Sequence, residues 1–224
     1  AIDLSLSNKG ILVLEDPSLL DFLKNLAYDQ FYCEHIYVFS TMALKKILSK
    51  YGMEIFDIDN IKTHGGSNRY YIKRKSNNFF KITDKVKENL EKEKKFGLDK
   101  FQTYKKFSIK VQESKKKLVR LFQKLIDKKK KIIGYGATAK SCTVLNYCNI
   151  KDIDYFYDTT SFKIGKFLPG SKIEIKKYKK LTRREADYVY LGAWNFKDEI
   201  FKKEKLFIKR GGKFITHVPT PKVI

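Results

Sequence analysis

The pattern of hydrophobic and polar positions in residues 1–81 predicts a mixture of strands and helices. Gly10–Glu15 is a short apolar run, which is typical of a buried strand. Asp16 and Pro17 follow, and an aspartate cap before a proline at the first helical position predicts a helix there. The other predicted elements are a helix over 40–52 and strands over 53–58 and 69–72. We therefore expect this region to be α/β.

Residues 82–130 show a helical pattern instead. Thr83 is a candidate cap for its start, and Gly97 is expected to divide the region into two helices. Beyond Gly97, one mostly apolar seam repeats in steps of three and four residues: Phe101, Tyr104, Ser108, Val111, Lys115, Leu118, Phe122 and Leu125. The seam predicts a helix that packs against a domain, with its other faces in water.

Strand and helix patterns alternate regularly in residues 131–224. Predicted strands cover 131–136, 153–158, 173–175, 187–191 and 213–216, and predicted helices cover 137–147 and 196–210. Such alternation is typical of βαβ units in a parallel sheet. Sheets of this kind bind ligands at the carboxyl ends of their strands.

Composition excludes several classes of protein. Hydrophobic residues make up 42% of the 224, which is too many for a disordered polymer. No apolar run approaches the ~18 residues of a membrane-spanning helix, and no export signal opens the chain. Three cysteines without a CxxC pair argue against a disulfide framework or an all-cysteine zinc site. We expect a cytoplasmic protein without a membrane partner.

The net charge of +23 suggests a nucleic-acid partner but does not require one. Residues 82–130 alone hold 17 Lys/Arg and 7 Asp/Glu. Most of the excess is lysine, in a chain also rich in Ile, Asn and Phe, which is the composition that an AT-rich genome tends to produce. No recognisable nucleic-acid-binding module accompanies the basic helix, so we interpret its lysines as a solvated face.

The segment 29–37 concentrates groups that can move a proton. Tyr32, Glu34 and His35 can supply an oxyanion-stabilising phenol, an orienting carboxylate and a general base. Histidine suits proton abstraction near neutral pH because its ordinary pKa is ~6.5. The alternative is a hydrogen-bonded cluster on the surface or in the core that has no catalytic role. A metal site is not expected, because no second histidine lies at helical spacing.

A second candidate site follows the first strand of the C-terminal region. Gly134–Lys140 satisfies the spacing G-x-G-x-x-G/A between a strand and a helix, and Asp158 ends the next strand. Glycines there let backbone amides reach a phosphate at a helix N-terminus. Lys140 would add a positive charge, and Asp158 could accept from a ribose hydroxyl. The alternative is a tight turn without a ligand.

Seven short segments, taken together, resemble those of a known family. They are 10–17 (GILVLEDP), 28–35 (YDQFYCEH), 64–69 (HGGSNR), 134–140 (GYGATAK), 145–148 (LNYC), 167–170 (FLPG) and 193–196 (AWNF). In this order they resemble the S-adenosylmethionine-dependent C-methyltransferases of nucleotide-linked deoxysugars. The resemblance extends along nearly the whole chain.

The resemblance implies an α/β protein that corresponds to only part of the family's domain arrangement. Family members have a zinc-binding domain, a class I methyltransferase domain and a C-terminal Rossmann-like domain. Residues 1–81 correspond to the C-terminal half of the methyltransferase domain, 82–130 to a basic helical connector, and 131–224 to the Rossmann-like nucleotide-sugar-binding domain. The zinc domain and the glycine-rich S-adenosylmethionine loop have no counterpart here, so this fragment is expected to be inactive alone.

The resemblance also implies a reaction. His35 would remove the C3 proton of a nucleotide-diphosphate 4-keto-deoxysugar, and the enolate would attack the methyl group of S-adenosylmethionine. Tyr32 and Glu34 would orient the base or stabilise the enolate. Cys33 and Asn68 depart from the residues expected at their positions. The implied substrate-binding residues are His64, Gly65, Ser67, Arg69, Gly134, Gly136, Ala137, Lys140, Asp158, Lys163 and Asn195.

One alternative of another class stays open. The C-terminal region could be a module that binds a nucleotide sugar or NAD without methyl transfer. The motif at 134–140 indicates a nucleotide but does not distinguish between these ligands.

Overall fold

The computed structural model describes residues 1–224 and divides them into two compact units. The N-terminal unit consists of Ala1–Asn25 and Tyr37–Phe107, and the C-terminal unit of Leu26–Ile36 and Ser108–Ile224. Each unit is therefore built from two separate stretches. This division differs from the predicted segments 1–81, 82–130 and 131–224, because helix α5 (Phe101–Asp127) contributes residues to both units.

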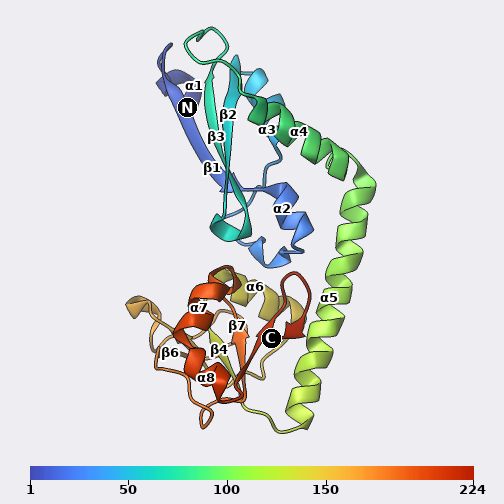
Figure 1. Ribbon diagram of the computed structural model, residues 1–224, viewed down its shortest axis with the longest axis vertical. Coiled ribbons are helices and arrows are strands. Elements are labelled where there is room, and N and C mark those ends of the chain that lie inside the picture. Colours follow the sequence, from blue (N-terminus) through green and yellow to red (C-terminus); the bar gives the residue numbers. More distant parts are fainter. The chain divides into compact units, whose positions relative to one another are not determined.

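The N-terminal unit is built on a three-stranded antiparallel sheet (Figure 1). The strands β1 (Ile11–Pro17), β3 (Ser67–Arg74) and β2 (Met53–Ile61) lie in that order, so the last of these three strands in the sequence occupies the centre. Its helices are α1 (Ile2–Ser5), α2 (Leu19–Lys24), α3 (Thr41–Ser49), the 3-10 turn η2 (Thr63–Gly65) and α4 (Asp84–Phe96).

One face of this sheet forms a hydrophobic core with α3 and α4. Leu44 and Leu48 of α3 and Val86 of α4 are buried against Ile55 of β2 and Ile72 of β3. A second cluster joins α2 to the start of α5, where the rings of Phe22 and Phe107 lie 5.6 Å apart. Alternation along the strands thus sends one set of side chains into the core, as the sequence pattern predicts.

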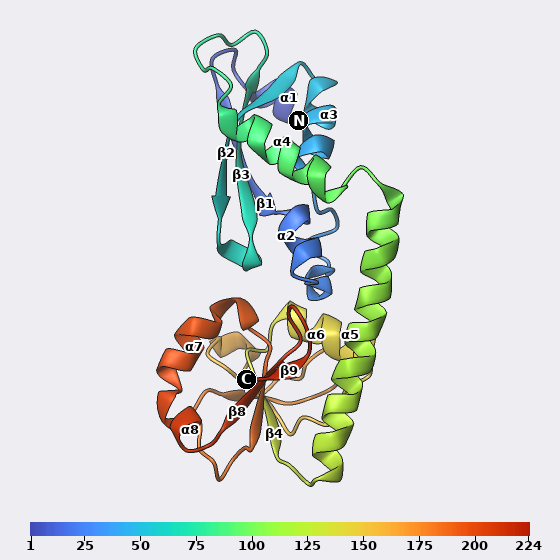
Figure 2. The same cartoon turned by 45° about the vertical axis from the view of Figure 1, so that its right-hand side comes forward.

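The C-terminal unit contains a six-stranded sheet in the order β6-β5-β4-β7-β8-β9 (Figure 2). The strands are β4 (Ile132–Tyr135), β5 (Phe156–Asp158), β6 (Ile175–Lys177), β7 (Tyr188–Leu191), β8 (Lys213–Thr216) and β9 (Lys222–Val223). All pairings are parallel except that of β9 with β8. The α/β fold class is confirmed. The order β6-β5-β4-β7-β8 is that of a dinucleotide-binding sheet.

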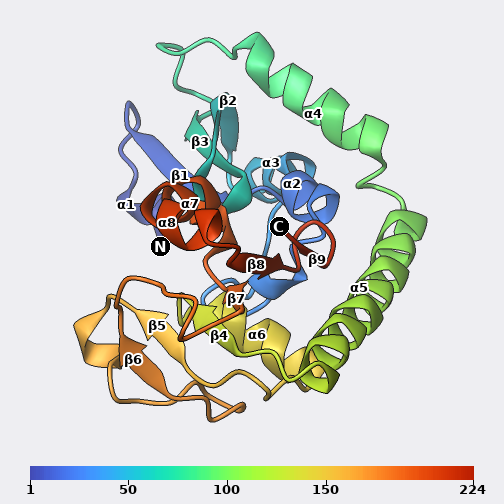
Figure 3. The ribbon, with the colours of Figure 1, turned by 60° about the horizontal axis from the view of Figure 1, so that its bottom comes forward.

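Helices cover both faces of the parallel sheet (Figure 3). On one face, α7 (Lys197–Lys203) and α8 (Lys205–Lys209) bury Ile200 and Phe207 against the strands. On the other face, α6 (Ala139–Cys148) and the second half of α5 pack against the sheet. The ring centroids of Phe122 in α5 and Tyr190 in β7 lie 5.9 Å apart. Two short 3-10 helices, η3 (Ser161–Lys163) and η4 (Trp194–Phe196), follow β5 and β7.

Several local expectations need correction. Pro17 ends β1 rather than starting a helix, and the hydroxyl of Ser18 caps α2 by accepting from the amide of Asp21. Thr83 occupies the cap position of α4, but its hydroxyl donates to Asp57 at 2.6 Å. The helix predicted over 196–210 is interrupted at Glu204.

Other local predictions are confirmed. Gly97 ends α4 in the left-handed conformation that favours glycine, with φ of 86°. The seam of α5 is buried at Leu118, Phe122 and Leu125, whereas Phe101 is exposed. None of the helices has the length and apolar character needed to cross a membrane.

Candidate active site

A pocket of about 340 Å³ opens at the carboxyl edge of the parallel sheet, in the C-terminal unit. The loops after β4, β5 and β7 form its walls, which is where sheets of this strand order bind ligands. Its lining comprises Tyr135, Gly136, Thr138, Tyr157, Asp158, Thr159, Thr160, Lys163, Tyr178, Ala193, Phe196, Glu199, Ile200 and Lys203. The volume falls within the range of small-molecule sites.

The glycine motif forms the tight turn between β4 and α6. Gly136 has φ of 85°, and a Cβ there would lie 2.7 Å from that of Ala193, so a side chain is excluded on both grounds. Gly134 lies inside β4, where a Cβ would collide with the ring of Phe156. The two glycines therefore differ: Gly136 lines the pocket, and Gly134 lets Phe156 pack beneath the strand.

Asp158 closes this turn with its own carboxylate. One oxygen accepts from the amide of Ala137 at 2.8 Å, and the other from the amide of Thr160 at 2.8 Å. Lys163 approaches the carboxylate at 3.6 Å and donates to the carbonyl of Ala137 at 2.9 Å. Burial alone would raise the pKa of Asp158, but these hydrogen bonds and the lysine charge hold that pKa below its usual range.

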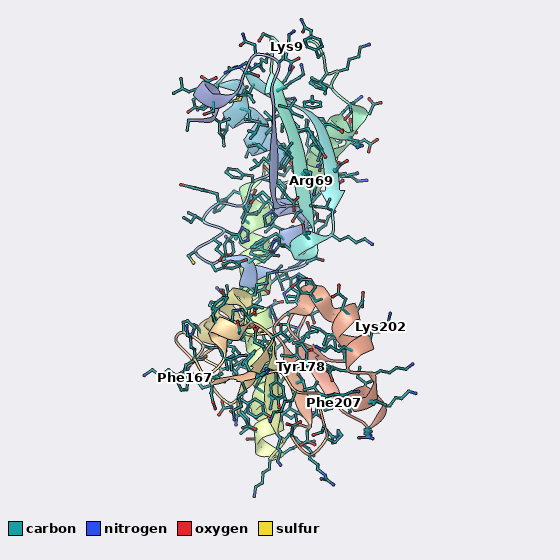
Figure 4. All side chains as sticks on the ribbon, turned by 90° about the vertical axis from the view of Figure 1, so that its left-hand side faces the viewer. Lys9, Arg69, Phe167, Tyr178, Lys202 and Phe207 are labelled. Carbon is teal, nitrogen blue, oxygen red and sulfur yellow. The ribbon has the colours of Figure 1, made fainter.

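Aromatic side chains form the far wall of the pocket. Tyr178, labelled in Figure 4, donates to the buried carboxylate of Glu204 at 2.6 Å, and the ammonium of Lys203 lies 3.5 Å from its ring centroid. Burial and the Glu204 charge raise the pKa of Tyr135 to about 12. These phenols therefore remain protonated at neutral pH. A pocket with stacking rings and two lysines suits an aromatic, anionic ligand.

The segment 26–36 packs on the same unit and carries the predicted base. Its first part, the 3-10 helix η1 (Tyr28–Gln30), is buried at all three residues. The rings of Tyr28 and Tyr147 of α6 lie 5.8 Å apart, and the hydroxyl of Thr143 donates to the carbonyl of Phe31 at 3.4 Å. The segment is thus held by its first half.

Asp29 is fully buried and receives side chains from two strand ends. Its Oδ2 accepts from the indole nitrogen of Trp194, after β7, at 2.5 Å. The same oxygen lies 3.3 Å from Nε2 of His217, which follows β8 and is also fully buried. Oδ1 has no hydrogen-bond partner. His217 Nδ1 lies 3.1 Å from the hydroxyl of Tyr190.

Lys140 supplies a positive charge near Asp29 and does not line the pocket. Its side chain is buried, and its ammonium lies 5.1 Å from the ring centroid of Trp194. Burial lowers the pKa of Lys140, and the Asp29 charge opposes this effect. Burial would likewise raise the pKa of Asp29, but His217, Trp194 and Lys140 together hold it below its usual range. Asp29 is therefore ionised at neutral pH.

The second half of the segment lies toward the surface. Tyr32 and His35 face each other with ring centroids 4.9 Å apart, and the amide of His35 donates to the carbonyl of Tyr32 at 2.9 Å. Both side chains are half-buried, whereas Glu34 is exposed. Burial, followed by the charges of Glu34 and Asp29, raises the pKa of Tyr32. The structure thus brings the predicted phenol and base together in one turn.

The predicted residues 64–69 belong to the other unit. His64 and Gly65 form η2, and Ser67 is buried and donates to the carbonyl of Thr63. Arg69 lies on β3 (Figure 4) and binds Glu15 of β1 at 2.9 Å. Asn68 is buried between Asn60 and Tyr70, with hydrogen bonds of 2.6 and 2.9 Å, so polar partners accompany its departure from the family pattern.

Comparison with known proteins identifies the family. Residues 62–219 match the family model described as the C-methyltransferase C-terminal domain. The chain belongs to the C-methyltransferase family. It is 31% identical over 221 residues to C-methyltransferase NovU of Streptomyces niveus, an alignment that covers 98% of this chain and 52% of the relative. The chain therefore spans about half the length of the curated relative that it matches.

The residues present do not form a cradle for S-adenosylmethionine in the N-terminal unit. The turn after β1 is filled by its own side chains: Ser18 caps α2, and a Cβ on Gly66 would lie 2.6 Å from Asp21. The one glycine motif of the fingerprint type lies in the C-terminal unit. Residues 1–224 also contain no group of three or more metal-ligating side chains, so the zinc implied by the resemblance has no site here.

Some residues of this candidate site were not predicted from the sequence. Asn195, which was predicted, lies in η4 beside the pocket-lining Phe196. The adjacent Trp194 and the more distant His217 instead converge on Asp29. The signal that pointed to Trp194 and Asn195 is their place after a predicted strand of the parallel sheet, where binding residues gather. The same signal was available for His217, which follows another predicted strand. Nothing local marks Asp29 as their common partner.

Proposed function

We propose that residues 1–224 form the substrate-binding and proton-abstracting part of a sugar C-methyltransferase. The supporting observation is that one unit holds both the pocket and the segment with Tyr32, Glu34 and His35. The ligand is a nucleotide-diphosphate 4-keto-deoxysugar. Lys163 and Lys203 suit its diphosphate, and the tyrosine wall suits its base.

In the proposed reaction, His35 takes the proton from C3 of the sugar. The electron pair of that C–H bond forms the C3–C4 double bond of an enolate, with the negative charge on the former ketone oxygen. Tyr32, with its raised pKa, remains a phenol and donates a hydrogen bond to that oxygen. Glu34 orients the imidazole. When bound, S-adenosylmethionine supplies the methyl group to the enolate, and these residues hold no complete site for it.

Deuterium exchange tests this function without a methyl donor. A thymidine-diphosphate 4-keto-deoxysugar is incubated in D₂O with the 224-residue chain, and mass spectrometry follows deuterium entering the carbon next to the ketone. We expect exchange above the protein-free rate, and a fall of about 100-fold or more in His35→Gln, within the range of general-base contributions. Glu91→Gln, an exposed site in α4, is the matched control.

The outcomes separate the alternatives. Binding of the nucleotide sugar by calorimetry without any deuterium entry would support the simple binding module instead. Tighter binding of NAD than of the nucleotide sugar would point the same way. Micromolar binding of S-adenosylmethionine by this chain would contradict the proposal that it cannot methylate alone.

A further inference from the structure

Three of the recognised segments meet at Asp29. Asp29 belongs to 28–35, Lys140 to 134–140, and Trp194 to 193–196, and His217 joins them after β8. We propose that Asp29 is the positioning residue of the catalytic segment: its buried carboxylate fixes residues 32–35 against the nucleotide pocket. This inference rests on the proposed function, because it assigns a task to a residue beside the proposed base.

The segment is built in two halves that suit this role. Tyr28, Asp29 and Gln30 are buried, whereas Glu34 is exposed and Tyr32 and His35 are half-buried. The turn that carries the base therefore has little packing of its own. Its orientation depends on the residues that precede it within six positions of the chain. In that buried half, Asp29 accepts a side-chain hydrogen bond from Trp194 at 2.5 Å.

The charge of Asp29 makes the anchor specific. A buried carboxylate is costly unless charged and hydrogen-bonding groups surround it. Its partners come from the ends of β7 and β8 and from α6, all at the carboxyl edge of the sheet. No neighbouring position of the segment offers a second carboxylate at this depth. A shift of the segment would leave the charge unpaired, so only one placement is stable.

Trp194 links the anchor to the pocket wall. It lies in η4 between Ala193 and Phe196, both of which line the pocket. The hydrogen bond from its indole to Asp29 therefore ties the base-bearing segment to the surface that the ligand contacts. Misplacement of a catalytic group by about 1 Å can lower a rate about 100-fold. The carboxylate thus governs the rate of proton transfer more than the affinity for the nucleotide.

The test compares Asp29→Asn with Asp152→Asn, the same change at an exposed site of the same unit. In the deuterium-exchange assay we expect Asp29→Asn to lower kcat about 10- to 100-fold and to change KM by less than about threefold. Trp194 is the chain's single tryptophan, so its emission reports this site alone. We expect its emission to shift in Asp29→Asn and to stay unchanged in Asp152→Asn.

Two results would overturn the proposal. One is a kcat within twofold of the wild type together with a shifted Trp194 emission, because the anchor would then be altered without effect. The other is a rise in KM that accounts for the whole loss, which would indicate a binding role. If Asp29→Asn does not fold, Trp194→Phe removes the indole donor while keeping the charge. A smaller fall in kcat is then expected, and no fall would overturn the proposal.

Backbone amide exchange distinguishes this proposal from the proposed function. If the wild type itself transfers no deuterium to the sugar, the proposed function fails. The positioning role is then judged by amide exchange over residues 28–36. We expect exchange about tenfold faster in Asp29→Asn than in Asp152→Asn, because an anchored segment opens less often. Equal rates in the two variants would refute the anchor.

Discussion

One buried carboxylate in each unit invites comparison: Glu93 in the N-terminal unit and Asp29 in the C-terminal unit, which also buries Asp158 and Glu204. The two are satisfied differently. In the N-terminal unit, Glu93 of α4 accepts from the amides of Thr41 and Met42 at 2.6 and 2.9 Å. Both of its oxygens are used. In the C-terminal unit, the side chains of Trp194 and His217 both approach Oδ2 of Asp29, and Oδ1 has no hydrogen-bond partner.

The difference separates a carboxylate that binds a helix N-terminus from one that we propose to position a catalytic segment. Glu93 sits at the first turn of α3, where unpaired amides and the helix dipole stabilise a negative charge. Any protein that packs two helices can use such an arrangement. Asp29 depends instead on an indole after β7, an imidazole after β8 and a lysine of α6, all at the carboxyl edge of the parallel sheet. An incompletely satisfied buried charge of this kind costs stability, and such costs are typical of functional sites.

The largest expected effect is the removal of Glu93. Glu93→Ala leaves two amides at the start of α3 buried without acceptors, so we expect the free energy of unfolding to fall by about 2–4 kcal/mol. Urea unfolding followed by circular dichroism measures this loss. Glu91→Ala, an exposed change in the same helix, should cost less than about 0.5 kcal/mol. Equal losses of unfolding free energy in the two variants would contradict the structural role given to Glu93.

An intermediate effect is expected from acid. The pKa of Asp29 is lowered in the folded protein, so on acidification the unfolded chain takes up this proton first. The stabilisation from Asp29 is therefore complete above its ordinary pKa of ~3.9 and is lost as pH falls through the lower folded value. Unfolding measured between pH 6 and pH 2 should show a shallower decline in Asp29→Asn than in the wild type. Parallel curves would contradict the ion pairing.

The smallest expected effect concerns Asn68. Asn68→Leu introduces an aliphatic side chain and leaves the Asn60 amide and the Tyr70 hydroxyl without their present partner. We expect a loss of about 1–2 kcal/mol in unfolding free energy, and deuterium transfer to the sugar unchanged. Asn78→Leu, at an exposed position, serves as the comparison. A higher free energy of unfolding in Asn68→Leu than in the wild type would show that the hydrogen bonds of Asn68 with Asn60 and Tyr70 contribute nothing to stability.

Features that depend on local residues could be predicted from the sequence. The strand Lys213–Thr216, the break at Gly97 and the cap at Ser40 follow from alternation, from a left-handed glycine and from a hydroxyl before a helix. The same rules gave wrong results at Pro17 and over 196–210. Pairing of Pro17 with Ser67 extended β1, and burial of Glu204 interrupted the helix. In both cases tertiary contacts overrode the local preference.

The candidate site could be predicted only in part. The motif at 134–140 indicates a strand-to-helix turn, and the turn lines the pocket at Gly136. The direction of the Lys140 side chain could not be predicted from the sequence. Its position on α6 does not indicate that it lies near Asp29, a buried carboxylate 111 residues earlier in the chain. Asp29 and His217 lie 188 positions apart and share no periodic pattern. Pairings of this range depend on the complete fold.

Because residues 26–36 belong to the C-terminal unit, that unit is encoded by two separate stretches of the gene, which matters for recombination between related genes. A gene segment encoding 108–224 would specify the whole parallel sheet but omit Tyr28 and Asp29, leaving His217 without its acidic partner. A single recombination point at 107/108 would therefore transfer the pocket without Tyr28, Asp29 and the predicted base His35. Under the proposed function, exchange of substrate specificity between relatives requires two stretches of DNA to move together, one for the segment 26–36 and one for the sheet with its pocket.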